Sequence, residues 1–164
     1  MIFNYNNAIP TNFKLTFPEL PELEYYALST NVPTTTLNPI EVPFRDVSAK
    51  IPDNRYHWDD ITVQLIMDEN LYAYEIMKQW QYDIREEGMW QDGLKDINLI
   101  PLDSNKNIEY SFKFHGAWPN MVGGWQYTSN ASTSDIISFD VTFSYQHFEI
   151  VRIKPIDFKI VTRG

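Results

Sequence analysis

The sequence predicts a mainly β protein, an antiparallel sandwich or barrel with one α-helix packed against it. Three observations support this prediction. Apolar and polar residues alternate over several short stretches, which is the period of a half-buried strand. One stretch has the period of an amphipathic helix instead. Aromatic residues make up 15% of the 164-residue chain, which suits large packed sheet faces.

A strand that runs directly into a helix forms the centre of this prediction. Residues 61–67 alternate and place one apolar row on a sheet face. Asp68, Glu69 and Asn70 then end the alternation, and an acidic run favours a helix start because it caps free amides and suits the positive end of the helix dipole. Gly88 is a typical stop. The helix is expected to bury one stripe, formed by Ala73, Ile76, Met77, Trp80 and Ile84.

Before this centre, the sequence predicts a hairpin followed by an extended arm. Phe13–Phe17 and Tyr25–Thr30 predict two strands that pair with each other across a loop. Prolines recur from Asn31 to Asn54, at positions 33, 39, 43 and 52, so this segment cannot be a central strand throughout. A long extended segment in a compact domain is usually functional or ordered by a partner. The alternative is a surface loop without such a role.

After the helix, the pattern is less regular. Residues 88–107 are expected to be irregular, and residues 110–115 alternate as a strand. Glycine and proline predict turns at residues 116–119 and 122–124, and another extended piece begins at Trp125.

Residues 137–145 give the clearest strand signal in the chain. Its apolar row is expected to pack, and its polar row is expected to meet water. Residues 146–164 continue to alternate, so they either add an edge strand to the same chain or pair with a neighbour. The apolar row contains Ile137, Phe139, Val141, Phe143 and Tyr145, and the polar row contains Ser138, Asp140, Thr142 and Ser144.

Composition limits the classes of function. The length predicts a single domain, and the absence of cysteine argues against a disulfide-stapled secreted domain. We see no signal peptide and no membrane-spanning run. A net charge of -9 argues against a protein that grips nucleic acid, but not against a wall past which DNA slides. Solubility alone is an equally good reason for the charge.

Few residues suggest chemistry. His57, His115 and His147 are far apart in the sequence and form no metal-ligand pair, and the carboxylates at 59–60 and 68–69 are better explained by strand alternation and the helix start. No nucleophile or phosphate-binding motif is present. We therefore expect no catalytic residue, no metal and no cofactor. A carbohydrate-binding or hydrolytic β-domain remains the alternative class, based on three tryptophans: Trp90, Trp118 and Trp125.

Several short motifs, taken in order, resemble the tail tube proteins of contractile-tailed bacteriophages. They cover about residues 12–148, whereas both ends depart from the family pattern. The motifs are Asn12-Phe13-Lys14-Leu15, Pro33 with a proline-rich arm to Asp53, Trp58-Asp59-Asp60-Ile61-Thr62-Val63, Met67-Asp68-Glu69, Trp80-Gln81, and Gly116-Ala117-Trp118-Pro119 with Val122-Gly123.

The resemblance implies a structural virion protein, a tail tube subunit that catalyses nothing. Such subunits form hexameric rings whose sheets join into one barrel, and the rings stack around a DNA-delivery channel. Residues 1–164 would be one tail-tube domain, with the arm at 31–57 and a C-terminal extension at 146–164. Ser138, Asp140, Thr142 and Ser144 would line the lumen. Contacts to neighbouring subunits or rings would involve Phe44, Arg45, Arg55, Tyr56 and Trp58.

The resemblance also implies partners. These are further copies of the chain, the tail sheath protein on the helix side, and baseplate and tail terminator proteins, with viral DNA passing unbound and no membrane. The protein would sit in the virion tail after assembly in the host cytoplasm. The alternatives are the inner-tube ring protein of a related contractile injection or secretion system and a baseplate-proximal tube protein.

Overall fold

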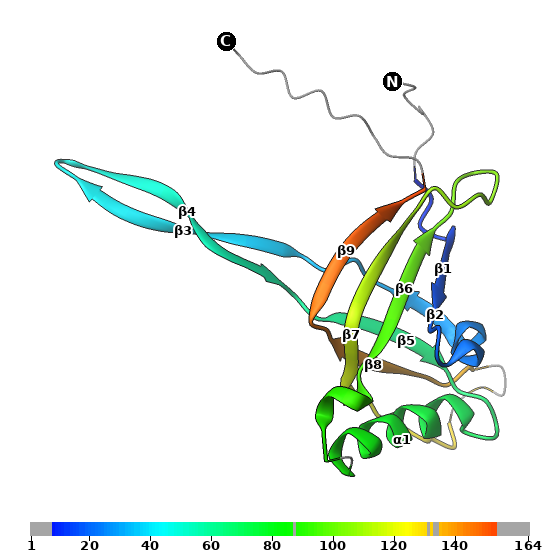
Figure 1. Ribbon diagram of the computed structural model, residues 1–164. Helices are drawn as coiled ribbons and strands as arrows, with labels where there is room; N and C mark the ends of the chain where they lie inside the picture. The colour runs from blue at the N-terminus through cyan, green and yellow to red at the C-terminus, as the bar shows by residue number, and fades with distance from the viewer. Residues whose placement is uncertain (1–7, 87, 131, 133–134, 154–164) are drawn as a thin grey trace.

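The computed structural model describes residues 8–86, 88–130, 132 and 135–153 (Figure 1). Most of the predicted carboxy-terminal extension and the first seven residues therefore lie outside the described part. The strands are β1 (Phe13–Thr16), β2 (Ala27–Thr30), β3 (Thr35–Phe44), β4 (Val47–Trp58), β5 (Ile61–Ile66), β6 (Lys95–Pro101), β7 (Tyr110–Val122), β8 (Ser138–Ser144) and β9 (His147–Arg152). The helices are α1 (Tyr72–Glu86) and two 3-10 helices, Pro21–Tyr26 and Trp90–Gly93.

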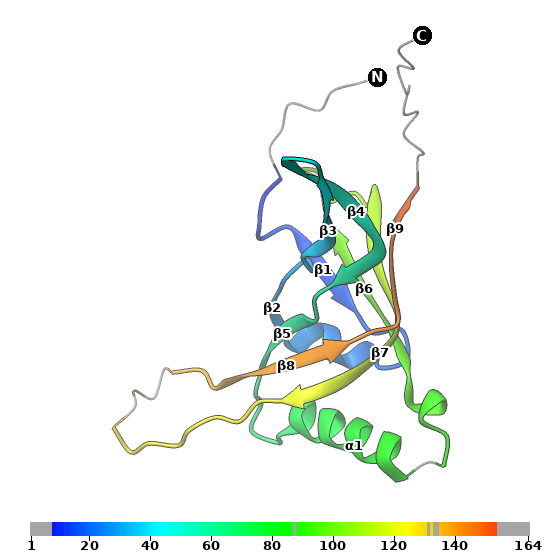
Figure 2. The same ribbon diagram turned by 90° about the vertical axis from the view of Figure 1, so that its left-hand side faces the viewer.

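Two antiparallel sheets share the long strand β7. Sheet A contains β9, the first half of β7, β6 and β1, whereas sheet B contains the second half of β7, β8, β5 and β2. The core lies between the sheets, and α1 covers one end of the body (Figures 1 and 2). The prediction of a mainly β, antiparallel structure with one packed helix is confirmed.

The strand β7 changes sheets at a glycine. Gly116 has a φ of +64°, and a Cβ at this position would lie 2.7 Å from the side-chain oxygen of Gln146. Glycine therefore allows both the left-handed backbone and the close approach of the β8–β9 corner. A second irregularity lies between Pro119 and Met121, where the register against β8 shifts. These two features bend β7, which continues as one strand through Gly116-Ala117-Trp118-Pro119.

Four details of the sequence prediction are wrong. The first two predicted strands do not pair with each other, because a 3-10 helix carries the chain from β1 in sheet A to β2 in sheet B. Residues 88–107 are not irregular, since they contain β6. Residues 116–119 are part of β7 and not a turn, and residues 125–127 form no strand. Two alternatives were open for the segment after Tyr145. The structure shows the first of them, because this segment forms β9, which pairs with β7 of the same chain.

The start of α1 is built as the acidic run suggests. A carboxylate oxygen of Asp68 accepts a hydrogen bond from the backbone N–H of Tyr72 at 2.8 Å, and this satisfies a donor that the helix cannot. At the other end, the indole N–H of Trp80 donates to the carbonyl oxygen of Gly93 at 2.6 Å. A Cβ on Gly93 would lie 2.4 Å from Ile84, so only glycine fits between the helix and the chain that follows it.

The stripe of α1 faces the core. Ala73, Met77 and Trp80 are buried, while Ile76 and Ile84 are half-buried and pack against the same cluster. Trp80 contacts Phe143 of β8 with ring centroids 5.6 Å apart, so the helix rests on the apolar face of sheet B.

Candidate assembly surfaces

Polar side chains on the outer face of sheet B form groups that are hydrogen-bonded across neighbouring strands. Ser29 in β2 donates to Gln64 in β5 at 3.2 Å, and Gln64 donates to Ser138 in β8 at 2.9 Å. The hydroxyls of Thr62 and Thr142 are 3.4 Å apart across β5 and β8. Side chains from three strands are thereby connected on one side of the sheet, opposite the buried row of β8.

The same surface extends onto β7. The amide of Asn120 donates to Asp60 at 2.9 Å and also to the hydroxyl of Ser144. No lysine or arginine occurs in β2, β5, β8 or residues 118–122 of β7. Asp60 and the exposed Asp140 are the acidic residues on or beside this surface. The face is therefore weakly acidic with no cation on its strands, and it also carries apolar side chains, because Ile66, Met121 and Trp118 pair with Ser138, Thr142 and Ser144.

The four predicted lumen residues lie together on this surface. Ser138, Asp140, Thr142 and Ser144 alternate with the buried Phe139, Val141 and Phe143. Thr62, Gln64 and Asn120 lie on the same surface but are not among the residues predicted for it from the sequence. The period-two pattern of residues 61–66 carried that signal for β5, whereas Asn120 lay in a stretch that we predicted to be a turn.

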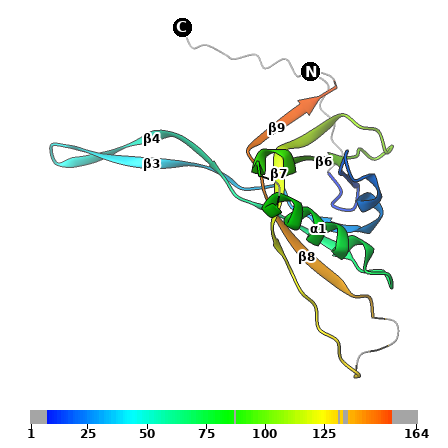
Figure 3. The same ribbon diagram turned by 60° about the horizontal axis from the view of Figure 1, so that its bottom comes forward.

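The strands β3 and β4 form a separate two-stranded sheet that projects from the body (Figures 1 and 3). Nearly every residue of this hairpin is exposed. Phe44 pairs with Val47 at the tip, and Arg45 between them has a φ of 53°. Arg55 and Tyr56 lie exposed in β4, nearer the body. Four of the five predicted contact residues are therefore available on the projecting element.

The fifth, Trp58, lies at the base of the hairpin and packs on its own chain. Its ring stacks on Tyr145 at 6.1 Å between centroids and meets His147 edge-on at 6.3 Å. The hydroxyl of Tyr145 donates to the carbonyl oxygen of Asp59 at 2.7 Å. Burial of the Tyr145 ring, followed by the nearby carboxylates of Asp60 and Asp59, raises the pKa of Tyr145 above its ordinary value. This cluster fixes the hairpin to the body.

A second polar cluster lies where β7 meets β9. The Nε2 atom of His115 is 2.7 Å from Glu149, and its Nδ1 atom is 3.6 Å from Asp96. The hydrogen bond with His115 lowers the pKa of Glu149. His147 stacks on His115 with 5.9 Å between centroids. No three His, Asp or Glu side chains among the described residues are placed to hold a metal ion.

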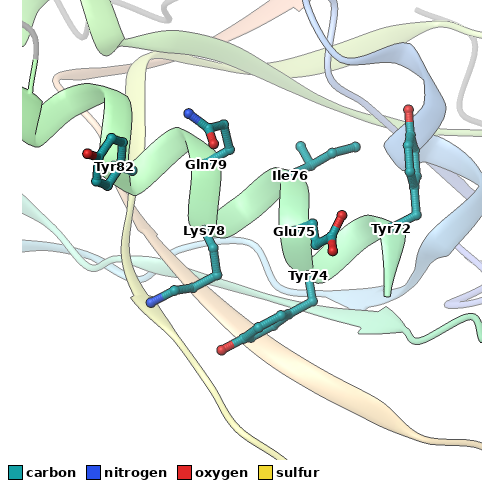
Figure 4. A pocket seen from close by; sticks show the side chains of 7 residues that line it. All are labelled: Tyr72, Tyr74, Glu75, Ile76, Lys78, Gln79 and Tyr82. Carbon is teal, nitrogen blue, oxygen red and sulfur yellow. The ribbon is translucent and has the colours of Figure 1, made fainter. Parts of the chain in front are cut away.

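One flank of α1 carries a shallow hollow (Figure 4), whose lining includes the exposed Glu75 and Gln79 as well as the half-buried Tyr74 and Ile76. Tyrosines stand at both ends of it and near its middle, with Glu75, Lys78 and Gln79 between them. The hollow is lined by Tyr72, Tyr74, Glu75, Ile76, Lys78, Gln79 and Tyr82.

In the described part of the chain, no helix is long and apolar enough to cross a membrane.

Solved tube and tube-terminator structures of contractile injection systems share the fold of this chain. The solved cryo-EM structure of the anti-feeding prophage tube-terminating cap has the same fold, with a TM-score of 0.70 at 17% identity, over 93% of this chain and 96% of that one. The family model for phage tail tube protein matches residues 3–151, so the chain belongs to that family, whose members are structural components of the virion tail. The resemblance seen in the sequence motifs is confirmed.

Two curated relatives agree with this family. A tail tube protein of Serratia phage KSP90 is 28% identical over 114 residues, which cover 66% of this chain and 64% of the relative. The match thus spans slightly less than two thirds of that protein's length. A tail tube terminator protein of Enterobacteria phage T4 is 22% identical over 160 residues, 89% of this chain and 90% of the relative.

Proposed function

We propose that the protein is a ring-forming subunit of a phage tail tube, whose hexameric rings stack around the DNA-delivery channel. The observation that supports this best is the two-sided character of sheet B. One side is buried against the core and α1, while the other carries hydrogen-bonded polar side chains, with Ile66, Met121 and Trp118 beside them, on strands that have no lysine or arginine. A surface without cations suits a wall past which DNA slides, because lysine and arginine are what bind phosphates.

Ring formation would continue sheet B from one copy to the next. Sheet B ends at β2 on one side, where no described strand pairs with the outer edge, and at residues 118–122 of β7 on the other, where Pro119 has no N–H and its carbonyl oxygen accepts a hydrogen bond from Gln81 of α1. Open edges are available for pairing, and closure into a barrel removes them. Joining β2 of one copy to β7 of the next would place Ser138, Asp140, Thr142 and Ser144 on the lumen wall.

DNA would pass this wall without being held. Affinity for nucleic acid comes mainly from lysine and arginine that neutralise phosphates. A surface with Asp140 and no cation on its strands offers none of this attraction, and its uncharged hydroxyls and amides are already bonded to one another.

The hairpin would contact neighbouring subunits or the next ring through Phe44, Arg45, Arg55 and Tyr56, with Trp58 holding its base. The outward side of α1 would meet the tail sheath protein. Further partners would be the baseplate and the tail terminator, and the protein would be assembled in the host cytoplasm into the virion tail. Its role would be structural, without a catalysed reaction or a cofactor.

A tail tube terminator is the second candidate. It is favoured by the relative from Enterobacteria phage T4, which matches over nearly the whole of both chains. A terminator would form single rings, whereas a tube subunit would form stacks. A baseplate-proximal tube protein, or the tube ring of a contractile injection system, would share the ring. Neighbouring genes for sheath, portal and capsid would favour the phage.

Negative-stain electron microscopy of the purified full chain over a concentration series tests the proposal. The expected result is rings that stack into tubes as concentration rises. Single rings that never stack would favour the terminator, and removal of residues 40–52 is expected to reduce stacking. A monomer at every concentration, even when seeded with tail components, would overturn the proposal.

A further inference from the structure

The outer half of the β3–β4 hairpin has one wholly apolar face. Opposite residues in an antiparallel pair point to the same side, and successive pairs alternate between the two sides. The pairs Phe44–Val47, Val42–Ala49 and Ile40–Ile51 therefore share one face, which we call the apolar hairpin face. Phe44 is 69% exposed and Val47 is 70% exposed. The opposite face holds Pro39, Glu41, Pro43, Ser48, Lys50 and Pro52.

The prolines of the hairpin reduce the number of backbone N–H groups that its edges offer to a partner strand. Pro39 pairs with Pro52, and two residues without N–H groups cannot exchange hydrogen bonds, so this is a non-hydrogen-bonded pair. Alternation makes Pro43–Ser48 a pair of the same kind. The N–H groups of such pairs point outward, so the prolines remove outward donors from both edges of the hairpin, two of them from β3.

An edge that has lost donors is a poorer template for an added strand: over residues 39–43 the β3 edge keeps only the outward N–H of Glu41, whereas the β4 edge keeps those of Ser48 and Lys50. Lateral pairing is therefore disfavoured along the outer half of β3, whereas the apolar face remains open. An isolated two-stranded hairpin is only marginally stable in water, so burial of this face would also stabilise the element that carries it. These facts favour binding flat, through the face.

The charge of the hairpin indicates what it meets. The chain carries -9 overall, yet residues 35–58 contain three acidic and three basic side chains. The hairpin is thus a neutral element on an acidic body, and it can approach another acidic copy without the repulsion that two bodies would feel. The apolar face itself has no cation to bind a phosphate.

We propose that the apolar hairpin face docks flat onto a second copy of this chain, while the face with Glu41 and Lys50 stays in solvent. The inference rests on the proposed ring and tube assembly. It adds which face makes the contact and disfavours strand addition along β3 as its geometry.

Single-cysteine labelling tests this directly, because the chain contains no cysteine. Val42→Cys places a thiol on the apolar hairpin face. Glu41→Cys, at the preceding residue, places one on the opposite face. Ala49→Cys and Lys50→Cys repeat the comparison on β4. Each full-length variant is reacted with a maleimide when dilute and again after assembly, and particles are checked by electron microscopy.

Assembly is expected to slow labelling at 42 and 49 by about 10-fold or more, and at 41 and 50 by less than about 3-fold. If particles form but 41 and 50 are protected as strongly, the docking geometry is wrong while the proposed function stands. Protection at 42 and 49 already in the dilute chain would also overturn the inference. If no particles form, the proposed function fails and the inference fails with it.

Discussion

Reversing the charge of the polar face of sheet B should turn a channel wall into a DNA-binding surface. Asp140→Lys with Thr142→Lys raises the charge of each chain by three units on two neighbouring positions of that face. The cost to folding should be small, because Asp140 is exposed and Thr142 loses one exposed hydroxyl contact of 3.4 Å.

The size of the effect follows from counterion release. Two lysines per chain give about twelve in a hexameric ring, and each phosphate that is neutralised contributes about 0.9 to the slope of log affinity against log salt. If half or more of the lysines reach DNA, the slope lies between about -5 and -11. Retained DNA should therefore be lost steeply between about 50 mM and 200 mM salt.

A matched control keeps the charge and moves it to the other side of the subunit. Glu75→Lys with Gln79→Lys also adds three units, but on the outward side of α1. Tubes are assembled with short duplex DNA and treated with nuclease at low salt. DNA should be protected with the sheet B variant and digested with the α1 variant. Equal digestion in both, or retention without salt dependence, would refute the placement of this face in the lumen.

Two further predictions concern Trp80, which anchors α1, and Tyr145, which packs at the base of the hairpin. Trp80→Phe removes the indole donor to Gly93 and part of a buried ring, and should lower the free energy of unfolding by about 2–4 kcal/mol in urea titrations, whereas Trp90→Phe should change it by less than about 0.5 kcal/mol. Tyr145→Phe loses the bond to Asp59 and should cost about 1 kcal/mol near neutral pH. Because the folded pKa of Tyr145 is raised, this stabilisation is complete below the unfolded pKa of about 10 and is lost as pH rises above it, so the difference between the two proteins should shrink there. A difference that stays constant through alkaline pH, or a Trp80→Phe effect no larger than its control, would contradict these assignments.

The parts of the fold that the sequence predicted are those set by local periodicity. The alternation of residues 137–145 reports β8 directly, because one face is buried and the other is not. The helix stripe and its acidic start were equally readable, since spacing and capping are local properties. The polar row of β8 followed from the same alternation, whereas its placement on a lumen wall came from the family resemblance and stays a prediction.

The parts that were missed depend on contacts between distant residues. The sequence of β6 shows only a short alternation, Ile97 and Leu99 against Asp96 and Asn98, between glycine and proline signals. Partner choice is also non-local, so adjacent strands β1 and β2 were wrongly paired. Gly116 looked like a turn because the need for a bend between two sheets is visible only in three dimensions.

The most direct test of the central claim is a cryo-EM reconstruction of the assembled full chain. We predict a ring in which β2 of each copy lies beside residues 118–122 of the next, with Ser138, Asp140, Thr142 and Ser144 facing the channel. A ring whose channel is lined by sheet A or by α1 would contradict the account.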